Sequence, residues 1–392
     1  MSKISHMTKR GIALLTAGWL GILPLSSAFA TDVKYSDWLD TLKFGGDLRL
    51  RHDSLLATSD GHNYDRERFR LRYGFEATEG DITAIFRMAS GTGSQLSANQ
   101  TEQALYSQKS LWIDLAYLKY KPLDIVTFQG GRMANPFWEN WSSSLVFDPD
   151  LNPEGYATLL NLPMGIYATF AQLPLNNSAA FADANPWMFG NRIGVKENLT
   201  EDIRGTLSVT DYAFTHEKQF TLGGTSTNFG NSRSGGVLTS AFNELQFDGE
   251  LAARVGDLPL SLQGGYVTNT MEQNPTAGKK NGRDGYIFGL VAGKASKAHT
   301  WEAAYFYKYL RDNAVVADMV DDDFGPGGTN LAGHIVWAAY NVRENVQFKL
   351  TYYNTHVLDQ TLSETALSST SSTFTSPQKY YSHIMFDVVV KI

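Results

Sequence analysis

The sequence predicts an all-β fold, a transmembrane antiparallel β-barrel of about 16 strands with long loops at one end and short turns at the other. Three observations support this fold class. Apolar and polar residues alternate along most of the chain. The connections between the alternating stretches are long and short by turns, one after the other. No apolar run beyond residue 30 is long enough for a membrane helix. A chain that crosses a membrane without helices must cross it as strands closed on themselves, because lipid offers backbone groups no hydrogen-bond partners.

The composition fits a strand-rich protein with many turns. Of the 392 residues, 12% are aromatic and 35 are glycine, while only 12 are proline. The absence of cysteine excludes disulfides, thiolate metal sites and a cysteine nucleophile. The net charge of −7 becomes −10 without residues 1–30, which carry three basic and no acidic side chains. Such an acidic chain is a poor binder of nucleic acid, so we expect no nucleic-acid partner.

The first 30 residues are predicted to be a secretory signal peptide that is cleaved after Ala30. Lys9 and Arg10 precede an apolar stretch from Gly11 to Leu25, and a small-x-small pattern ends at Ala30. The alternative is a short membrane anchor, but the apolar stretch falls short of the about 20 residues that a spanning helix needs. The expected organisation is therefore a signal peptide (1–30), a short periplasmic segment (31–41) and a barrel (42–392).

Period-two alternation recurs from about Leu42 to the C-terminus. A clear example is the stretch in which Phe69 and Leu71 alternate with Arg68, Arg70 and Arg72. The strands are expected at 42–53, 65–78, 82–91, 109–121, 124–133, 153–160, 163–172, 186–198, 202–213, 238–254, 258–270, 284–296, 299–310, 329–340, 345–356 and 379–391. Many approach the ten or so residues that a tilted strand needs to cross a bilayer.

The connections between these strands differ in length. Tight, turn-rich connections are expected at 78–81, 121–124, 198–202, 256–259, 296–299 and 341–345. The stretches 91–108, 134–152, 214–237, 271–283, 311–328 and 357–378 are long and rich in Gly, Ser, Thr, Asn and Asp. Outer-membrane barrels have short periplasmic turns and longer outside loops, whereas a soluble β-sandwich has loops of mixed length at both ends.

Tyrosines and tryptophans at the strand ends support a membrane location. Examples are Trp112, Tyr120, Trp301 and Tyr352. Tyr and Trp favour the membrane interface, because one end of the side chain is apolar and the other forms hydrogen bonds. The alternative is that they are core aromatics of a secreted β-protein.

Several motifs resemble a porin family of Gram-negative outer-membrane β-barrels. They are GDLRLR (46–51), RERFRLR (66–72), LWIDLAYLKY (111–120), GGRMANPFW (130–138) and VFDPDLNPEG (146–155). The resemblance covers the N-terminal third of the chain, and the rest agrees in strand pattern. It implies an outer-membrane barrel that acts as a porin, and it implies no particular solute.

A basic patch is the sharpest feature of the predicted interior. The patch consists of arginines that share the faces of the first two strands, and we predict that they line the channel: Arg49, Arg51, Arg66, Arg68, Arg70 and Arg72. Neighbouring strands are about 4.8 Å apart and arginine keeps its proton, so the patch needs water, counter-ions or carboxylates around it. The alternative is a structural ladder in which the arginines pair with local acids such as Asp65 and Glu67.

Two acidic sets are candidates to face this patch. The first lies in the loop 134–152 and its continuation, where prolines stiffen the chain: Glu139, Asp148, Asp150 and Glu154. In sixteen-strand porins the loop in this position folds into the barrel and narrows it; the alternative is a lid over the rim. The second set is Glu244, Asp248 and Glu250, on the inner face of the tenth strand, opposite the second strand. Either set would create a transverse field that orients solutes.

No metal site, cofactor or enzymatic activity is predicted. Asp148, Asp150 and Glu154 alternate as in a calcium loop, but Pro153 stands where an EF-hand needs glycine and Leu159 where it needs glutamate. The run 321–323 reads as a solvated outside loop, at most with loosely held divalent ions. The chain contains no H-E-x-x-H and no G-x-S-x-G motif, so we expect no enzyme.

The function predicted from the sequence is an outer-membrane porin, a passive channel for small hydrophilic solutes or ions through a charged constriction. Its partners would be outer-membrane lipid and lipopolysaccharide, the solutes, and copies of itself, since sixteen-strand porins are commonly homotrimers. The alternatives are a solute-specific channel and a non-conducting barrel that anchors or sheathes a surface or electron-transfer complex. The sequence leaves the solute and the sign of the ion selectivity open.

Overall fold

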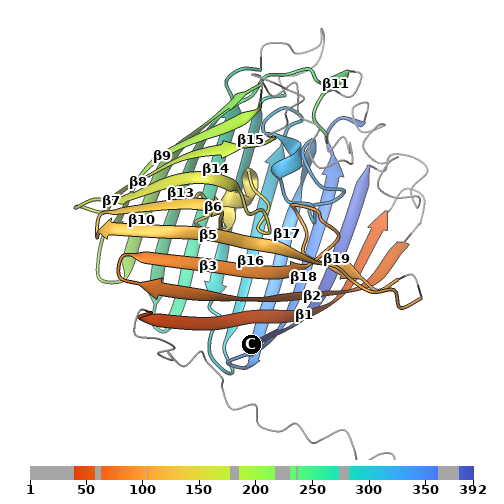
Figure 1. Cartoon of the computed structure of the whole chain (residues 1–392). Helices are drawn as coiled ribbons and strands as arrows, with labels where there is room; N and C mark the ends of the chain where they lie inside the picture. Colours follow the sequence, from red (N-terminus) through yellow and green to blue (C-terminus); the bar gives the residue numbers. More distant parts are fainter. Residues whose placement is uncertain are drawn as a thin grey trace, which may run out of the picture.

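The computed structural model describes residues 39–57, 63–103, 105–176, 185–216, 230–234, 237–272, 282–360 and 379–392. Within these residues the chain forms one closed antiparallel barrel (Figure 1). The predicted signal peptide (1–30) and most of the predicted segment 31–41 lie outside the described residues.

The barrel strands lie within a few residues of the predicted ranges. They are β1 (Thr41–Ala57), β2 (Asn63–Glu79), β3 (Ile82–Ser90), β5 (Leu111–Leu123), β6 (Val126–Arg132), β7 (Glu154–Asn161), β8 (Ile166–Pro174), β9 (Trp187–Asn198), β10 (Ile203–Thr215), β13 (Asn243–Val255), β14 (Leu258–Asn269), β15 (Asp284–Gly293), β16 (Trp301–Leu310), β17 (Leu331–Arg343), β18 (Val346–Val357) and β19 (Tyr380–Lys391). The predicted count of 16 barrel strands is confirmed.

Three further strands are short and were not predicted. The strand β4 (Gln100–Thr101) extends the barrel sheet beside β2. The strands β11 (Arg233–Ser234) and β12 (Val237–Leu238) form a separate hairpin in a long connection. The tenth predicted barrel strand corresponds to β13. Its predicted start at residue 238 was five residues early and falls on the last residue of β12.

The barrel closes where the first strand meets the last. Strand β1 pairs with β2 on one side and with β19 on the other, both antiparallel. Along this seam Arg51 stands opposite Asp387, and Asp53 stands opposite Met385. A closed sheet leaves no strand edge unpaired, which is the condition for a barrel in lipid.

The two ends of the barrel differ as the sequence predicts. One end has tight turns, among them those at Gly80 and Gly256, where φ angles of 51° and 61° favour glycine. The described parts of the long connections lie at the opposite end, at the upper right of Figure 1. Two of them enter the barrel: the first inner loop (residues 134–152), with the short helix η1 (Trp141–Leu145), and the second inner loop (residues 311–330), with η5 (Ala317–Met319).

The outer face of the barrel is apolar and the inner face is polar, the inverse of a soluble β-protein. Leu50, Ile193, Leu207 and Phe288 are all more than half exposed on the outside. Polar side chains such as Gln246 point inwards and are buried. The alternation follows from the pleat of each strand, which sends successive side chains to opposite faces. No helix among the described residues is long and apolar enough to cross a membrane.

Candidate functional site: the charged interior of the barrel

The first inner loop crosses the barrel from β6 to the opposite wall. Trp141 N donates a hydrogen bond to Gln263 Oε1 of β14 (3.0 Å), and Ser142 Oγ donates to Asp248 of β13 (3.2 Å). Lys308 Nζ of β16 donates to the carbonyl oxygen of Ser144 (2.7 Å). The loop therefore folds into the lumen, and the alternative of a lid over the rim is excluded.

Local sequence explains the shape of this loop. The side chain of Asn140 caps η1 by accepting a hydrogen bond from Ser142 N (2.9 Å). Phe137 and Phe147 flank the helix and both pack edge-on against Tyr212 of β10, with ring centroids 5.2 and 5.3 Å away. All three rings are buried, so an apolar cluster anchors the loop inside the barrel.

The second inner loop was predicted to be a solvated outside loop, and that prediction is wrong. Val315, Val320 and Phe324 have no solvent exposure at all, and Asp321 is only 2% exposed. Val316 N donates to Glu244 Oε1 of β13 (2.8 Å), which ties the loop to the wall. The apolar run 314–317 was the signal in the sequence, because a solvated loop gains nothing from consecutive valines.

The six arginines of β1 and β2, called the arginine wall below, point inwards as predicted. The strand register sets Arg49 opposite Arg70 and Arg51 opposite Arg68. Like charges directly opposite each other repel, so the arrangement requires counter-charges. Asp65 and Glu67 do not supply them, since they bind Ser54 and His52 instead. The carboxylates come from the adjacent strands and the inner loops.

Asp53 is the central carboxylate of the arginine wall. It has no solvent exposure and accepts hydrogen bonds from Arg66 (2.8 Å), Arg68 (3.0 Å) and His383 (2.6 Å). Arg51 binds Asp387 of β19 through two hydrogen bonds, of 2.7 and 3.0 Å. Bidentate pairs of this kind are the strongest that arginine makes.

The inner loops also supply partners to the arginine wall. Arg72 donates to Asp150 of the first inner loop, and Arg51 Nη1 lies 3.1 Å from Asp323 of the second. Arg70 pairs with Asp47 within the wall (2.7 Å). The basic wall and the acidic loop are therefore in direct contact rather than facing each other across open water.

The remaining predicted acids are distributed over the interior. Glu139 accepts a hydrogen bond from Tyr167 (3.0 Å), and Glu154, the first residue of β7, forms an ion pair with Arg132 (3.0 Å). On β13, Glu244 is fully buried and contacts the second inner loop, Asp248 contacts the first, and Glu250 accepts from Ser261 (2.6 Å). Glu244 and Asp248 therefore hold the two inner loops, while Glu250 binds the neighbouring strand β14, and the three do not form a separate wall opposite the arginines.

One wall carboxylate was missed by the sequence analysis. At a β-bulge, Arg87 pairs with Leu115 and the next residue pairs with Ile113, which leaves Asp114 as the extra residue of β5. The bulge turns both Asp114 and Leu115 inwards. Asp114 accepts hydrogen bonds from Arg87 (2.6 Å) and from Asn152 of the first inner loop (2.7 Å). The sequence gives no signal for the bulge, because the apolar alternation continues through it.

Three carboxylates from the two inner loops meet beside the arginine wall. Asp148, Asp321 and Asp322, called the aspartate cluster below, each place one oxygen within 4.8 Å of the others. Burial and the neighbouring carboxylates raise the pKa of Asp148 and of Asp322 well above its usual range. Burial likewise raises the pKa of Asp321 to about 6, against the opposing effect of Lys308. Asp148 was a predicted site residue, but its partners were not predicted.

The neighbouring acids behave in the opposite way. Burial would raise the pKa of Asp150, but Arg72 and Arg70 outweigh it and hold the pKa well below the usual range. Arg51 and His383 likewise outweigh burial at Asp323 and lower its pKa. Within the first inner loop the pKa is therefore raised at Asp148 and lowered at Asp150, only two residues further along the chain.

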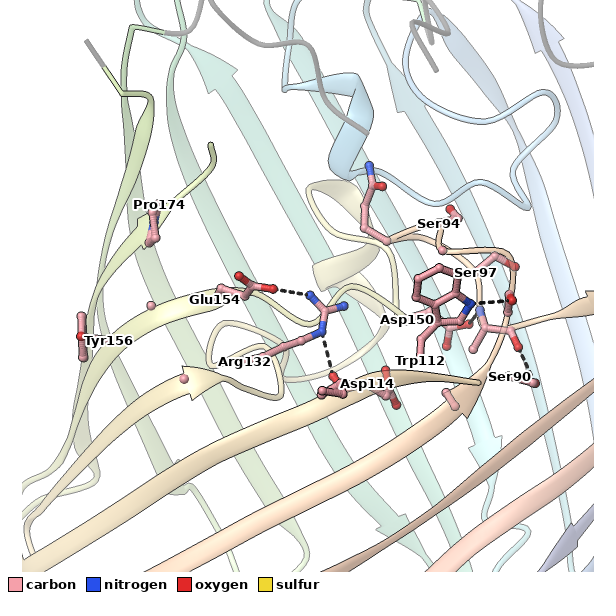
Figure 2. A pocket seen from close by; sticks show the side chains of 18 of the residues that line it. Ser90, Ser94, Ser97, Trp112, Asp114, Arg132, Asp150, Glu154, Tyr156 and Pro174 are labelled. Carbon is pink, nitrogen blue, oxygen red and sulfur yellow. Dashed lines mark hydrogen bonds and ion pairs between the residues drawn. The ribbon is translucent and has the colours of Figure 1, made fainter. Parts of the chain in front are cut away.

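A cavity of about 890 Å³ borders the first inner loop (Figure 2). Its lining combines the aromatic Trp112 with the charged Asp114, Arg132, Asp150 and Glu154. Arg132 donates to Glu154 (3.0 Å) and to the carbonyl oxygen of Asp114 (3.1 Å), as Figure 2 shows. The side chain of Arg132 remains 27% exposed, so charged groups meet solvent here.

A closed 16-strand barrel with a loop across its lumen and a charged interior is the architecture of a porin-type protein. The family described as "Putative porin" matches residues 54–219 and 217–367, and the chain belongs to this family. In fold it is similar to the solved structure of "Salmonella typhi OmpF complex with Daunomycin", with a TM-score of 0.53 and 12% sequence identity over 90% of this chain and 98% of that chain. No relative was found among the curated proteins.

Proposed function

We propose that the protein is an outer-membrane porin, a passive channel through which small hydrophilic solutes or ions pass a charged constriction. The observation that carries this proposal is the first inner loop, which crosses the lumen and brings Asp150 against Arg72 of the wall. Fixed charges at the narrowest part of a pore set an electrostatic barrier, and a barrier of this kind selects among solutes by charge.

Of the predicted arginines only some are accessible to solutes, and two arginines outside the predicted set, Arg87 and Arg132, are accessible as well. The side chains of Arg51 and Arg68 are only 5% and 9% exposed, whereas those of Arg66 and Arg87 are 26% and 30% exposed. The buried arginines hold the wall together, and the accessible ones act on the solute. Because the accessible arginines are paired with carboxylates, we expect only weak to moderate ion selectivity.

The location follows from the same features. The signal peptide (1–30) would direct the chain out of the cytoplasm and be cleaved after Ala30. The apolar outer face would contact lipid and lipopolysaccharide in the outer membrane. We propose a homotrimer as the assembly, and cross-linking in native membranes followed by electrophoresis would show a species of three times the monomer mass.

Planar-bilayer recording of the purified barrel tests the function. We expect discrete conductance steps in KCl, and a reversal potential in a KCl gradient that changes when Arg66, Arg87 and Arg132 are replaced together by alanine. A protein that migrates as a folded barrel in unboiled samples, but gives no opening events at any voltage, contradicts the proposal. Reversal potentials that stay unchanged in the triple variant would show that these arginines do not act on the permeating ions.

One observation favours a second function, that of a barrel whose conduction depends on a partner. The two inner loops bury an apolar cluster inside the lumen, including Phe137, Phe147 and Phe324, none of them more than 2% exposed. Such packing suits an anchor or sheath for a surface or electron-transfer complex. This alternative would be supported if the purified protein gave no conductance in planar bilayers and began to conduct only after an outer-membrane extract was added.

A further inference from the structure

The aspartate cluster has the spacing of a cation site. Its three oxygens lie within 4.8 Å of one another. Oxygens on opposite sides of one Ca²⁺ are about 4.6–5.2 Å apart, given Ca–O distances of 2.3–2.6 Å, whereas around Mg²⁺ they are about 4.0–4.2 Å apart. Three oxygens this close allow one Ca²⁺ to contact all three carboxylates with small adjustments of the side chains.

The hydrogen bonds leave one buried oxygen of Asp321 without a partner. Both oxygens of Asp148 accept backbone N–H groups, from Asp150 (2.6 Å) and Asp322 (3.2 Å), and Asp321 Oδ1 accepts from Asp323 N (3.0 Å). The other oxygen of this carboxylate, Asp321 Oδ2, has no hydrogen-bond partner, and the residue is only 2% exposed to solvent. A buried oxygen without a partner is costly, and a bound cation would satisfy it.

The described part of the chain places no basic side chain in contact with the cluster. Among the described residues, no nitrogen of Lys, Arg or His lies within 4.0 Å of these three carboxylates. The buried cation Lys308, whose charge acts on Asp321, donates instead to the carbonyl oxygen of Ser144 and lies 5.1 Å from the ring of Phe324. The neighbouring arginines are bound by Asp150 and Asp323.

We propose that Asp148, Asp321 and Asp322 bind one hard divalent cation, Ca²⁺ in preference to Mg²⁺, and that this ion fastens the two inner loops to each other. Ca²⁺ accepts six to eight oxygens in flexible geometry, which suits carboxylates from two irregular loops, with water completing its shell. The loops already touch at this point, where Asp148 N donates to the carbonyl oxygen of Met319 (2.7 Å).

The ion would act as a brace across the lumen. Without it, three crowded carboxylates oppose the contact between the loops; with it, the same carboxylates hold the loops together. The binding site stands independently of the channel, whereas an effect on conductance rests on the proposed function. We expect removal of the ion to raise the single-channel conductance at least about twofold, because the first inner loop moves away from its present position.

The test measures Ca²⁺ and Mg²⁺ binding directly. The full-length mature barrel, folded in detergent and stripped with EDTA, is titrated by calorimetry with Ca²⁺ alone or Mg²⁺ alone. We expect one Ca²⁺ per chain with a dissociation constant between about 10⁻⁵ and 10⁻³ M, and weaker Mg²⁺ binding. The variants Asp148→Asn and Asp321→Asn should weaken Ca²⁺ binding at least about tenfold.

The matched control is Asp312→Asn, which removes another buried carboxylate of the second inner loop outside the cluster. It should bind Ca²⁺ as the wild type does, and unboiled electrophoresis checks that every variant is a folded barrel. Absence of Ca²⁺ binding by the wild type at about 10⁻² M, or wild-type binding by both cluster variants, overturns the site. If the wild type binds Ca²⁺ but EDTA does not change its conductance, the proposal that the ion holds the two inner loops in place across the lumen is wrong. A barrel that binds Ca²⁺ but never conducts contradicts the proposed function and leaves the site intact.

Discussion

The arginine wall and the aspartate cluster lie side by side in the barrel, yet they handle charge in opposite ways. In the wall each arginine contacts an acid or an amide, and the carboxylate of Asp53 serves two arginines and a histidine. In the cluster three carboxylates meet, and none of the described Lys, Arg or His side chains is within 4.0 Å of them. The difference teaches that a run of like charges in a sequence does not reveal its role, because the role depends on partners supplied by distant segments.

The largest expected effect comes from removing the central acid of the wall. Asp53→Asn leaves Arg66, Arg68 and His383 without their shared carboxylate in a buried place, which should lower the free energy of unfolding by about 3–5 kcal/mol. Urea unfolding of the barrel in lipid vesicles measures it. Asp65→Asn, on the outer side of the neighbouring strand, is the control and should change stability by less than about 0.5 kcal/mol. Equal effects of the two variants would show that the wall pairs do not stabilise the barrel.

The next effect concerns the contact between the wall and the first inner loop. Arg72→Ala and Asp150→Ala should each destabilise the barrel, but the double variant should lose less than the sum of the two. We expect a coupling energy of about 2 kcal/mol, because the pair is largely shielded from solvent. Urea unfolding of the four proteins of this double-mutant cycle gives the value. Strict additivity would mean that loop and wall are energetically independent at this contact.

A smaller effect, of opposite sign, is expected in the aspartate cluster. In EDTA, Asp321→Asn removes a buried carboxylate whose ionisation is opposed by burial and by its neighbours, and should stabilise the barrel by about 1 kcal/mol. In millimolar Ca²⁺ the order should reverse, with the wild type more stable than the variant. Thermal unfolding under both conditions measures this. A variant that is less stable than the wild type in EDTA would contradict the view that these carboxylates repel one another.

The smallest effect separates accessible from buried arginines. Arg66→Ala should shift the reversal potential in a KCl gradient towards cations by a few millivolts, because its side chain is 26% exposed. Arg68→Ala, with a side chain that is 9% exposed, should shift it less while destabilising the barrel more. The opposite ranking in bilayer recordings would place the permeation path against the buried part of the wall.

The strands could be predicted from sequence because each carries its own signal. Period-two polarity, and turns such as those at Gly80 and Gly256, are local features, and a barrel with an apolar outer face and a polar inner face keeps the alternation over the whole strand. The inward direction of Arg68 and Arg70 followed from the same parity. Their partners did not follow, since Asp387 lies 336 residues from Arg51 along the chain.

The inner loops show where sequence reasoning failed. Residues 321–323 read as solvated because acidic, glycine-rich segments usually are, and the valines before them have no period that assigns a face. Asp148 and Asp322 are 174 residues apart, so no motif joins them. The bulge at Asp114 could not be predicted for another reason. One extra residue reverses the face to which the following side chains point, and the composition of the strand does not reveal it.

The seam between β1 and β19 has a consequence for the order of folding events. Among the 16 long barrel strands every other pair joins strands that follow one another in the chain and can form as a hairpin, whereas this pair joins the first and the last. Until it forms, the sheet has two open edges that can recruit another chain. Because this pairing is the most distant in sequence among the described strands, we expect closure to be the slow step of folding. The ion pair between Arg51 and Asp387 would then form last and hold the seam closed.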